Sequence, residues 1–117
     1  MHSRLCVSAL LFVVVACGGS DSMSTPPASA KTYDVFTIGD TFSPSFLTIA
    51  PGDTVRFNFA AGSDGMGHDV TFDNTPGHPA SIPVTKTGTV SRVFAARGSF
   101  HYNCFVHPGM IGDVVVQ

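Results

Sequence analysis

Cys104-Phe105-Val106-His107-Pro108-Gly109-Met110 is the stretch around which the rest of this 117-residue chain is organised. It places a thiol, an imidazole and a thioether in the order C-x2-H-x2-M, in a short turn between two strand-like runs. The spacing of Cys104 and His107 lets one turn present both donors to a single ion, and Pro108 stiffens that turn. Because thiolate and thioether ligands favour Cu(I) and imidazole also binds copper, the stretch predicts a site for a soft metal ion.

A fourth donor is available upstream. His68 opens the alternating run 68–72 (HDVTF), and only the fold can bring it to the turn. Two His, one Cys and a distant Met form the ligand set of a blue-copper electron-transfer site. Each residue alone has a simpler interpretation, because a lone Cys is often a small buried hydrophobe and Met often fills gaps in a core. Together, His68, Cys104, His107 and Met110 favour the metal site.

Three other side chains are weaker candidates. Met66 lies close to His68 in sequence and competes with Met110 for the thioether position. His101 alternates with Phe100 and Tyr102, so we expect it to face outward. His78 lies in an irregular Pro-containing segment, and we expect it to be solvated.

The N-terminus has the features of an export signal. A charged start is followed by an apolar run over residues 5–16, which is too short to span a bilayer. Val14-Val15-Ala16-Cys17 resembles the bacterial lipobox, so we expect residues 1–17 to be a lipoprotein-type signal peptide with Cys17 as the lipidation point. An ordinary signal peptide or a short retained anchor are the alternatives. Residues 18–31 are small, polar and Pro-containing, which predicts a flexible tether.

Cysteine usage supports the metal site. Cys6 lies in the expected leader and Cys17 at its end, so the exported domain keeps only Cys104. A lone Cys in an exported protein cannot form an internal disulfide, and a reactive thiol or a metal ligand explains it better.

The charge balance argues against a nucleic-acid-binding protein. From residue 32 onward seven Asp stand against four Lys and Arg, without a basic cluster, so nucleic-acid binding is not expected.

The remaining chain, residues 32–117, predicts one all-β domain. Short runs rich in Val, Thr and Phe alternate with Gly, Pro and Asp turns, which is typical of a two-sheet sandwich. Val55, Phe57 and Phe59 share one face and should point into the core. Segment 73–83 is irregular and an unlikely place for a central strand. The expected strands are 33–38, 46–50, 54–59, 68–72, 89–94, 98–103 and 111–116.

The domain resembles the cupredoxins of the plastocyanin/amicyanin type. The resemblance rests on residues 50–55 (APGDTV), 68–72 (HDVTF) and 98–112, and it covers essentially everything after residue 32. It implies a Greek-key β-sandwich of about eight strands with one copper ion at one end. His68, Cys104 and His107 would be the equatorial ligands and Met110 the axial one.

One position departs from that family. Many relatives carry Asn directly after the first ligand His, whereas this chain has Asp69. Groups beside the ligands tune a metal, so an ionised Asp69 near the thiolate should lower the reduction potential.

The resemblance implies a one-electron carrier that works outside the cytoplasm and is not an enzyme. Redox partners would dock near His107, where electrons pass through an exposed imidazole edge, and Pro108, Gly109, Phe42 or Phe46 would form an apolar docking patch. We expect a monomer, periplasmic or on the cell surface, held to a membrane by lipid at Cys17, with no nucleic-acid partner. A periplasmic copper-storage or delivery protein is the alternative, and a metal-free β-sandwich binding module is the simplest competing interpretation.

Overall fold

The structure is a computed structural model that describes residues 29–117. The expected signal peptide with Cys6 and Cys17, and the tether up to residue 28, lie outside the described residues. Within the described part, no helix is present that is long and apolar enough to cross a membrane.

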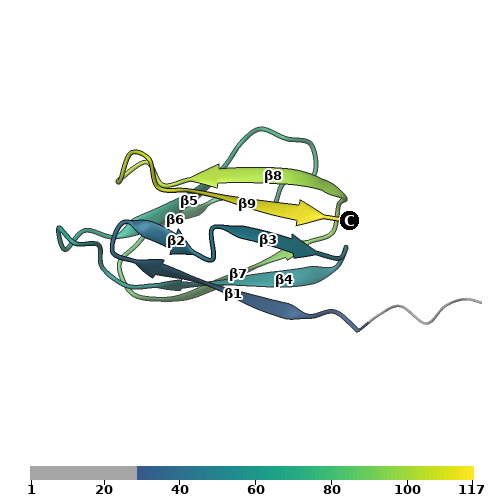
Figure 1. The fold of residues 1–117 in the computed structure, drawn as a ribbon, viewed down its shortest axis with the longest axis horizontal. Coiled ribbons are helices and arrows are strands. Elements are labelled where there is room, and N and C mark those ends of the chain that lie inside the picture. The colour runs from purple at the N-terminus through teal and green to yellow at the C-terminus, as the bar shows by residue number, and fades with distance from the viewer. Residues whose placement is uncertain (1–28) are drawn as a thin grey trace, which may run out of the picture.

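The described chain forms nine β-strands in two sheets (Figure 1). One sheet has four strands in the order β2-β1-β4-β7, and the other has five in the order β3-β9-β8-β5-β6. The strands are β1 (Thr32–Ile38), β2 (Thr41–Ser43), β3 (Phe46–Ile49), β4 (Asp53–Phe59), β5 (His68–Phe72), β6 (Ile82–Thr85), β7 (Gly88–Phe94), β8 (Gly98–Asn103) and β9 (Ile111–Val116).

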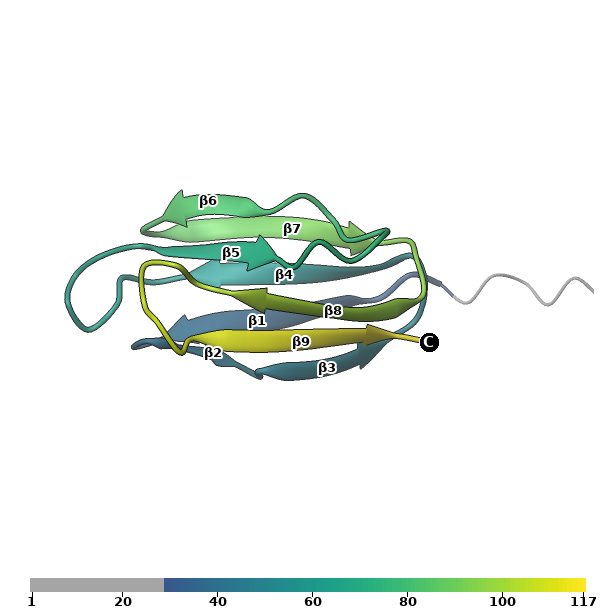
Figure 2. The ribbon, with the colours of Figure 1, turned by 90° about the horizontal axis from the view of Figure 1, so that it is seen from above.

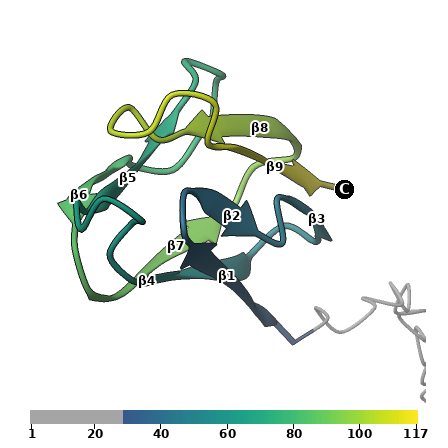
Figure 3. The ribbon, with the colours of Figure 1, turned by 60° about the vertical axis from the view of Figure 1, so that its left-hand side comes forward.

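The two sheets lie face to face as the layers of a sandwich. Their strands run along the same long axis when the molecule is seen from above (Figure 2). An oblique view places β8 and β9 in one layer and β1 and β4 in the other (Figure 3). Each sheet mixes antiparallel pairs with one parallel pair, β1 with β4 and β3 with β9. The all-β sandwich predicted from sequence is confirmed.

Alternating side chains build the core between the layers. Val55, Phe57 and Phe59 on β4 are all buried, as their alternation predicts. Tyr102 on β8 makes edge-on contacts with the rings of Phe42 and Phe57, at centroid separations of 4.9 and 5.5 Å. Edge-to-face packing is the favoured geometry for aromatic pairs. This aromatic core supports the strand that leads into Cys104.

The described chain has nine strands, whereas the sequence pattern predicted seven and the family resemblance implied about eight. Two strands, β2 and β6, escaped sequence analysis. β2 has only three residues, too few to show an alternating pattern. β6 begins at Ile82, inside the segment expected to be irregular, and contains Pro83. It forms the edge of its sheet, where a residue without an N–H group is tolerated.

One end of the sandwich gathers the loops that matter for chemistry. The β8–β9 loop, which carries Cys104 to Met110, lies at the same end as the β4–β5 loop (Figures 1 and 2). The C-terminus and the first described residues lie at the opposite end. Antiparallel pairing of β5 with β8, with Thr71 opposite Asn103, brings the start of β5 toward the β8–β9 loop.

Candidate metal centre

Three of the expected donors converge in the described structure. The ligand atoms of His68, Cys104 and His107 all lie within 4.8 Å of one another. Cys104 Sγ is 3.9 Å from His68 Nδ1 and 3.7 Å from His107 Nδ1. His68 is the first residue of β5, and Cys104 directly follows β8. The pairing of these two strands therefore joins donors that are 36 residues apart in sequence.

The cluster is shielded from water. His68 is fully buried, and Cys104 and His107 are 2% and 8% exposed. Burial lowers the pKa of His68, with a smaller contribution from the neighbouring His107, and this favours the neutral imidazole that binds metals. Burial also raises the pKa of the Cys104 thiol, so a metal ion must displace its proton. Burial of the donor residues limits solvent access to a bound ion.

Met110 closes the same loop. Its backbone oxygen accepts a hydrogen bond from Cys104 N at 2.9 Å, and its N–H donates to His107 O at 3.1 Å. Met110 is 2% exposed and belongs, like Cys104, to the hydrophobic core of the sandwich. The arrangement places a thioether in the loop that carries the thiol and one imidazole. Two imidazoles, a thiolate and a nearby thioether fit copper, although the ligand roles of the four residues stay predictions.

The weaker candidates lie elsewhere. Met66 is half exposed, so it is not buried with the donor cluster. His101 Nδ1 pairs with Asp113 Oδ1 on the neighbouring strand at 2.8 Å. His78 is partly buried, where solvation was expected, and its Nδ1 lies 2.7 Å from Pro79 O. Neither His101 nor His78 belongs to the His68–Cys104–His107 cluster.

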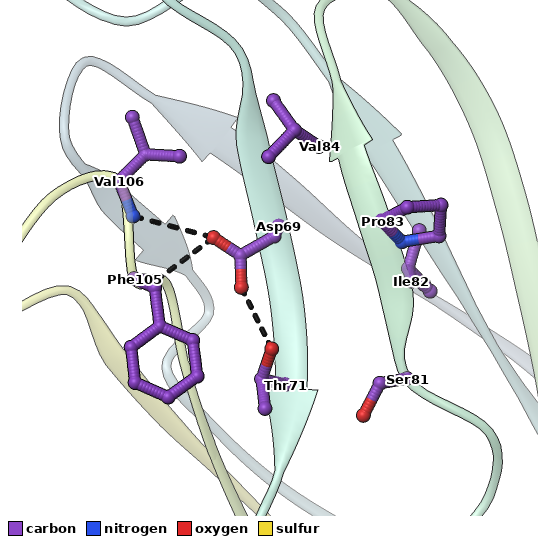
Figure 4. Close-up of a pocket in the computed structure, with 8 residues that line it drawn as sticks. All are labelled: Asp69, Thr71, Ser81, Ile82, Pro83, Val84, Phe105 and Val106. Carbon is purple, nitrogen blue, oxygen red and sulfur yellow. Dashed lines mark hydrogen bonds between the residues drawn. The ribbon is translucent and has the colours of Figure 1, made fainter.

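Asp69 ties β5 to the β8–β9 loop. Its Oδ1 accepts hydrogen bonds from the backbone N–H groups of Phe105 at 2.8 Å and Val106 at 3.3 Å (Figure 4). Its Oδ2 accepts from the Thr71 hydroxyl at 2.8 Å. The Cys104 thiol donates to Oδ1 at 3.3 Å. The side chain is therefore buried beside the sulfur and holds the loop in place, and it also lines an open groove of about 640 Å³.

Two further carboxylates reach His107 from the other side, and sequence analysis missed both. His107 Nε2 lies 3.2 Å from each oxygen of Asp64 and 3.5 Å from Asp40 Oδ1. Hydrogen bonds from Met66 N–H and from His107 lower the pKa of Asp64, and those from Ser63 lower the pKa of Asp40. Both are thus ionised acceptors at neutral pH. No local motif marks them, because the contacts depend on the folding of two separate loops.

Two expectations about the docking surface are wrong. The imidazole edge of His107 is covered rather than exposed, because its Nε2 faces Asp64 and Asp40. Phe42 is 4% exposed and packs on Tyr102 in the core, so it cannot form a surface patch. Phe46, by contrast, is 59% exposed. Phe105, which follows Cys104, is 71% exposed at the candidate metal end.

The curated proteins similar to this chain include two plastocyanins. The protein from Nostoc punctiforme is 31% identical over 133 residues, which cover 97% of this chain and 91% of that protein. The protein from Prochlorothrix hollandica is 27% identical over 121 residues, covering 92% and 90% respectively. No protein-family model matches the chain.

Solved structures with the same fold include proteins of three kinds. Oxidized plastocyanin from Dryopteris crassirhizoma superposes with a TM-score of 0.61 at 21% identity, over 73% of this chain and all of that one. An amicyanin variant with Cu(I) superposes with a TM-score of 0.62 at 27% identity, over 74% of this chain and 82% of that one. A copper-containing nitrite reductase from Thermus scotoductus also gives 0.62, at 26% identity, but only 22% of that chain is covered.

The two-sheet sandwich, with a buried His–Cys–His cluster at one end, defines a cupredoxin of the plastocyanin/amicyanin type. Given its relative from Nostoc punctiforme, the chain belongs to the plastocyanin family.

Proposed function

We propose that this protein is a mononuclear type 1 copper protein that carries single electrons between redox partners outside the cytoplasm. The observation that carries the proposal is the buried convergence of His68, Cys104 and His107 within 4.8 Å. One copper ion is the cofactor implied by this donor set and by the family. Bound copper supplies a one-electron couple between Cu(I) and Cu(II).

The chain's own residues hold that ion. His68, Cys104 and His107 would hold the ion, and Met110 would be a fourth, weaker ligand. The donors come from a strand end and a short loop braced by hydrogen bonds, which favours one geometry for both oxidation states. Four protein ligands leave no open position for a substrate, so we assign electron transfer rather than catalysis. The nitrite reductase resembles this chain over less than a quarter of its own length.

Partners dock at the metal end as transient redox proteins, for which small interfaces suffice. Pro108 and Gly109 lie in the loop that carries His107, and both are exposed. We propose a monomer that is exported through the signal of residues 1–17 and attached to a membrane by lipid at Cys17. The described domain begins at the end opposite the β8–β9 loop (Figure 1), so an anchor on that side leaves the metal end available to partners.

A Cu(II) titration followed by absorption and EPR spectroscopy tests the proposal. We expect an intense thiolate-to-copper band that saturates at one equivalent. Cys104→Ser should abolish the band, whereas His101→Ala, which removes an imidazole outside the cluster, should keep it. A colourless parent protein would contradict the proposal, and rapid loss of copper to a weak chelator would favour storage or delivery.

A further inference from the structure

We propose that Asp64, supported by Asp40, is a positioning residue for His107. Its carboxylate accepts the Nε2–H of the imidazole, directs Nδ1 to the metal and places negative charge behind the ligand. This inference rests on the proposed copper site. It assigns to the β4–β5 loop a part in setting the affinity and the reduction potential of that site.

The two nitrogens of His107 face different partners. Nδ1 lies 3.7 Å from Cys104 Sγ, inside the donor cluster, while Nε2 lies 3.2 Å from both oxygens of Asp64. An ionised carboxylate can only accept hydrogen bonds, so the proton of the neutral ring is held on Nε2. The lone pair of Nδ1 then points toward the metal position. A carboxylate on the distal nitrogen of a ligand His fixes the tautomer and makes the ligand more basic.

The loop holds both carboxylates in place. Asp64 Oδ1 accepts a hydrogen bond from Met66 N at 2.8 Å, and Met66 O accepts one from Gly62 N at 2.8 Å. Asp40 accepts from Ser63 through both oxygens, at 3.1 Å from the backbone N–H and 2.6 Å from the hydroxyl. The acceptors therefore face His107 without further rearrangement, which reduces the entropy cost of the contact.

Glycine at position 62 is required for this close approach. A Cβ atom there would lie 2.9 Å from His107 Nε2 and 2.8 Å from Asp40 Oδ1, closer than real Cβ contacts allow. The backbone of the loop thus lies directly against the imidazole edge. As a result the His107 side chain is only 9% exposed, while the Asp64 and Asp40 side chains beside it are 50% and 42% exposed.

The two candidate His ligands differ in this respect. His68 Nε2 is buried and has no hydrogen-bond partner within residues 29–117. Of these two imidazoles, only that of His107 has carboxylates at its distal nitrogen. The negative charge of Asp64 and Asp40 therefore acts on the metal site through His107. Negative charge near the metal favours Cu(II) over Cu(I), because the oxidised ion carries the larger positive charge. Removing Asp64 should therefore weaken Cu(II) binding and raise the reduction potential.

The test uses the full chain with Asp64→Ala, and Asp73→Ala as the matched control. Asp73 is an exposed Asp that follows β5 at the end away from His68, so its removal changes net charge without touching the cluster. In the metal-free protein, long-range nitrogen–proton NMR correlations of the imidazoles report which nitrogen carries the proton. In the copper-loaded protein, Cu(II) affinity and midpoint potential are measured. Asp64→Asn, which keeps an acceptor for Met66 N–H, replaces Asp64→Ala if that variant does not fold.

We expect His107 to be the Nε2–H tautomer in the parent and in Asp73→Ala, and to become a mixture in Asp64→Ala. We also expect Cu(II) affinity to fall by about tenfold or more, the usual effect of removing such a partner, and the potential to rise more than in the control. An Asp64→Ala protein with the parent's tautomer, affinity and potential would overturn the inference. So would a second equivalent of metal bound through Asp64, which would make it a ligand.

The two proposals fail separately. A parent that binds no copper defeats the electron-carrier function, yet the imidazole tautomer of the metal-free protein still decides whether Asp64 orients His107. A parent with the thiolate-to-copper band and an unaffected Asp64→Ala variant keeps the function and defeats the positioning role.

Discussion

Replacing Asp69 by Asn should raise the reduction potential of the copper-loaded protein. The substitution preserves the shape of the side chain. An Asn Oδ1 still accepts from the backbone N–H groups of Phe105 and Val106, and its amide nitrogen can donate to the Thr71 hydroxyl. The main change is therefore the loss of one negative charge beside the Cys104 sulfur.

The size of the effect follows from the separation of 3.3 Å between Asp69 Oδ1 and Cys104 Sγ. At that separation two unit charges interact by about 1 kcal/mol at the permittivity of water and about 5 kcal/mol at an effective permittivity of about 20. For a one-electron couple these energies correspond to about 50 mV and about 200 mV. The lower value is the better guide, because the charge gained on oxidation is spread beyond the sulfur and hydrogen bonds already stabilise the carboxylate.

Voltammetry of the parent, Asp69→Asn and Asp73→Asn measures this shift. Salt screens the charge of the exposed Asp73 more strongly than that of the buried Asp69, so the difference between the two variants should persist at high ionic strength. Absorption spectra verify that all three keep the thiolate-to-copper band. If the parent's potential equals or exceeds that of Asp69→Asn, the carboxylate does not act as a charge near the metal and the reasoning is refuted.

Three further predictions concern stability. Gly112→Ala should destabilise the metal-free protein by about 1–3 kcal/mol in urea unfolding, because a Cβ there would overlap the Tyr102 ring; unchanged stability would show that the ring can move aside. Hydrogen bonds from Lys31 N and Ala50 N lower the pKa of Asp53 in the folded protein. The ionised carboxylate therefore contributes fully to the free energy of unfolding above its ordinary pKa of 3.8. This contribution is lost as pH falls through the lower pKa of the folded state. Asp53→Asn should therefore be less stable than the parent at neutral pH, and the difference should shrink in acid; a constant difference across the pH series would contradict this assignment. Copper at about 100 times its dissociation constant should stabilise the parent by about 2.7 kcal/mol, seen as a higher unfolding temperature that a chelator or Cys104→Ser removes.

Local signals in the sequence were sufficient for much of the fold. Strands β5, β8 and β9 have the bounds expected from the sequence. In β5 and β8 the side chains on the two faces differ in polarity, which is the alternation typical of a strand. β2 and β6 lack such a signal, since one has three residues and the other is a Pro-containing edge strand. The position of a single side chain can be equally hard to predict, as Phe42 shows, because it was expected on the surface and is buried. Its burial depends on contact with Tyr102, which is 60 residues away in sequence.

The sequence by itself determined the class of domain. It also predicted the donor set, because Cys104, His107 and Met110 lie within one turn and their chemistry favours a soft metal. Only the tertiary structure decided how that set is completed and surrounded. His68 reaches Cys104 through the pairing of β5 with β8, and Asp64 and Asp40 reach His107 from loops 43 and 67 residues away in sequence. The physical reason is that such contacts depend on strand pairing and loop packing, which bring distant residues together without any local pattern.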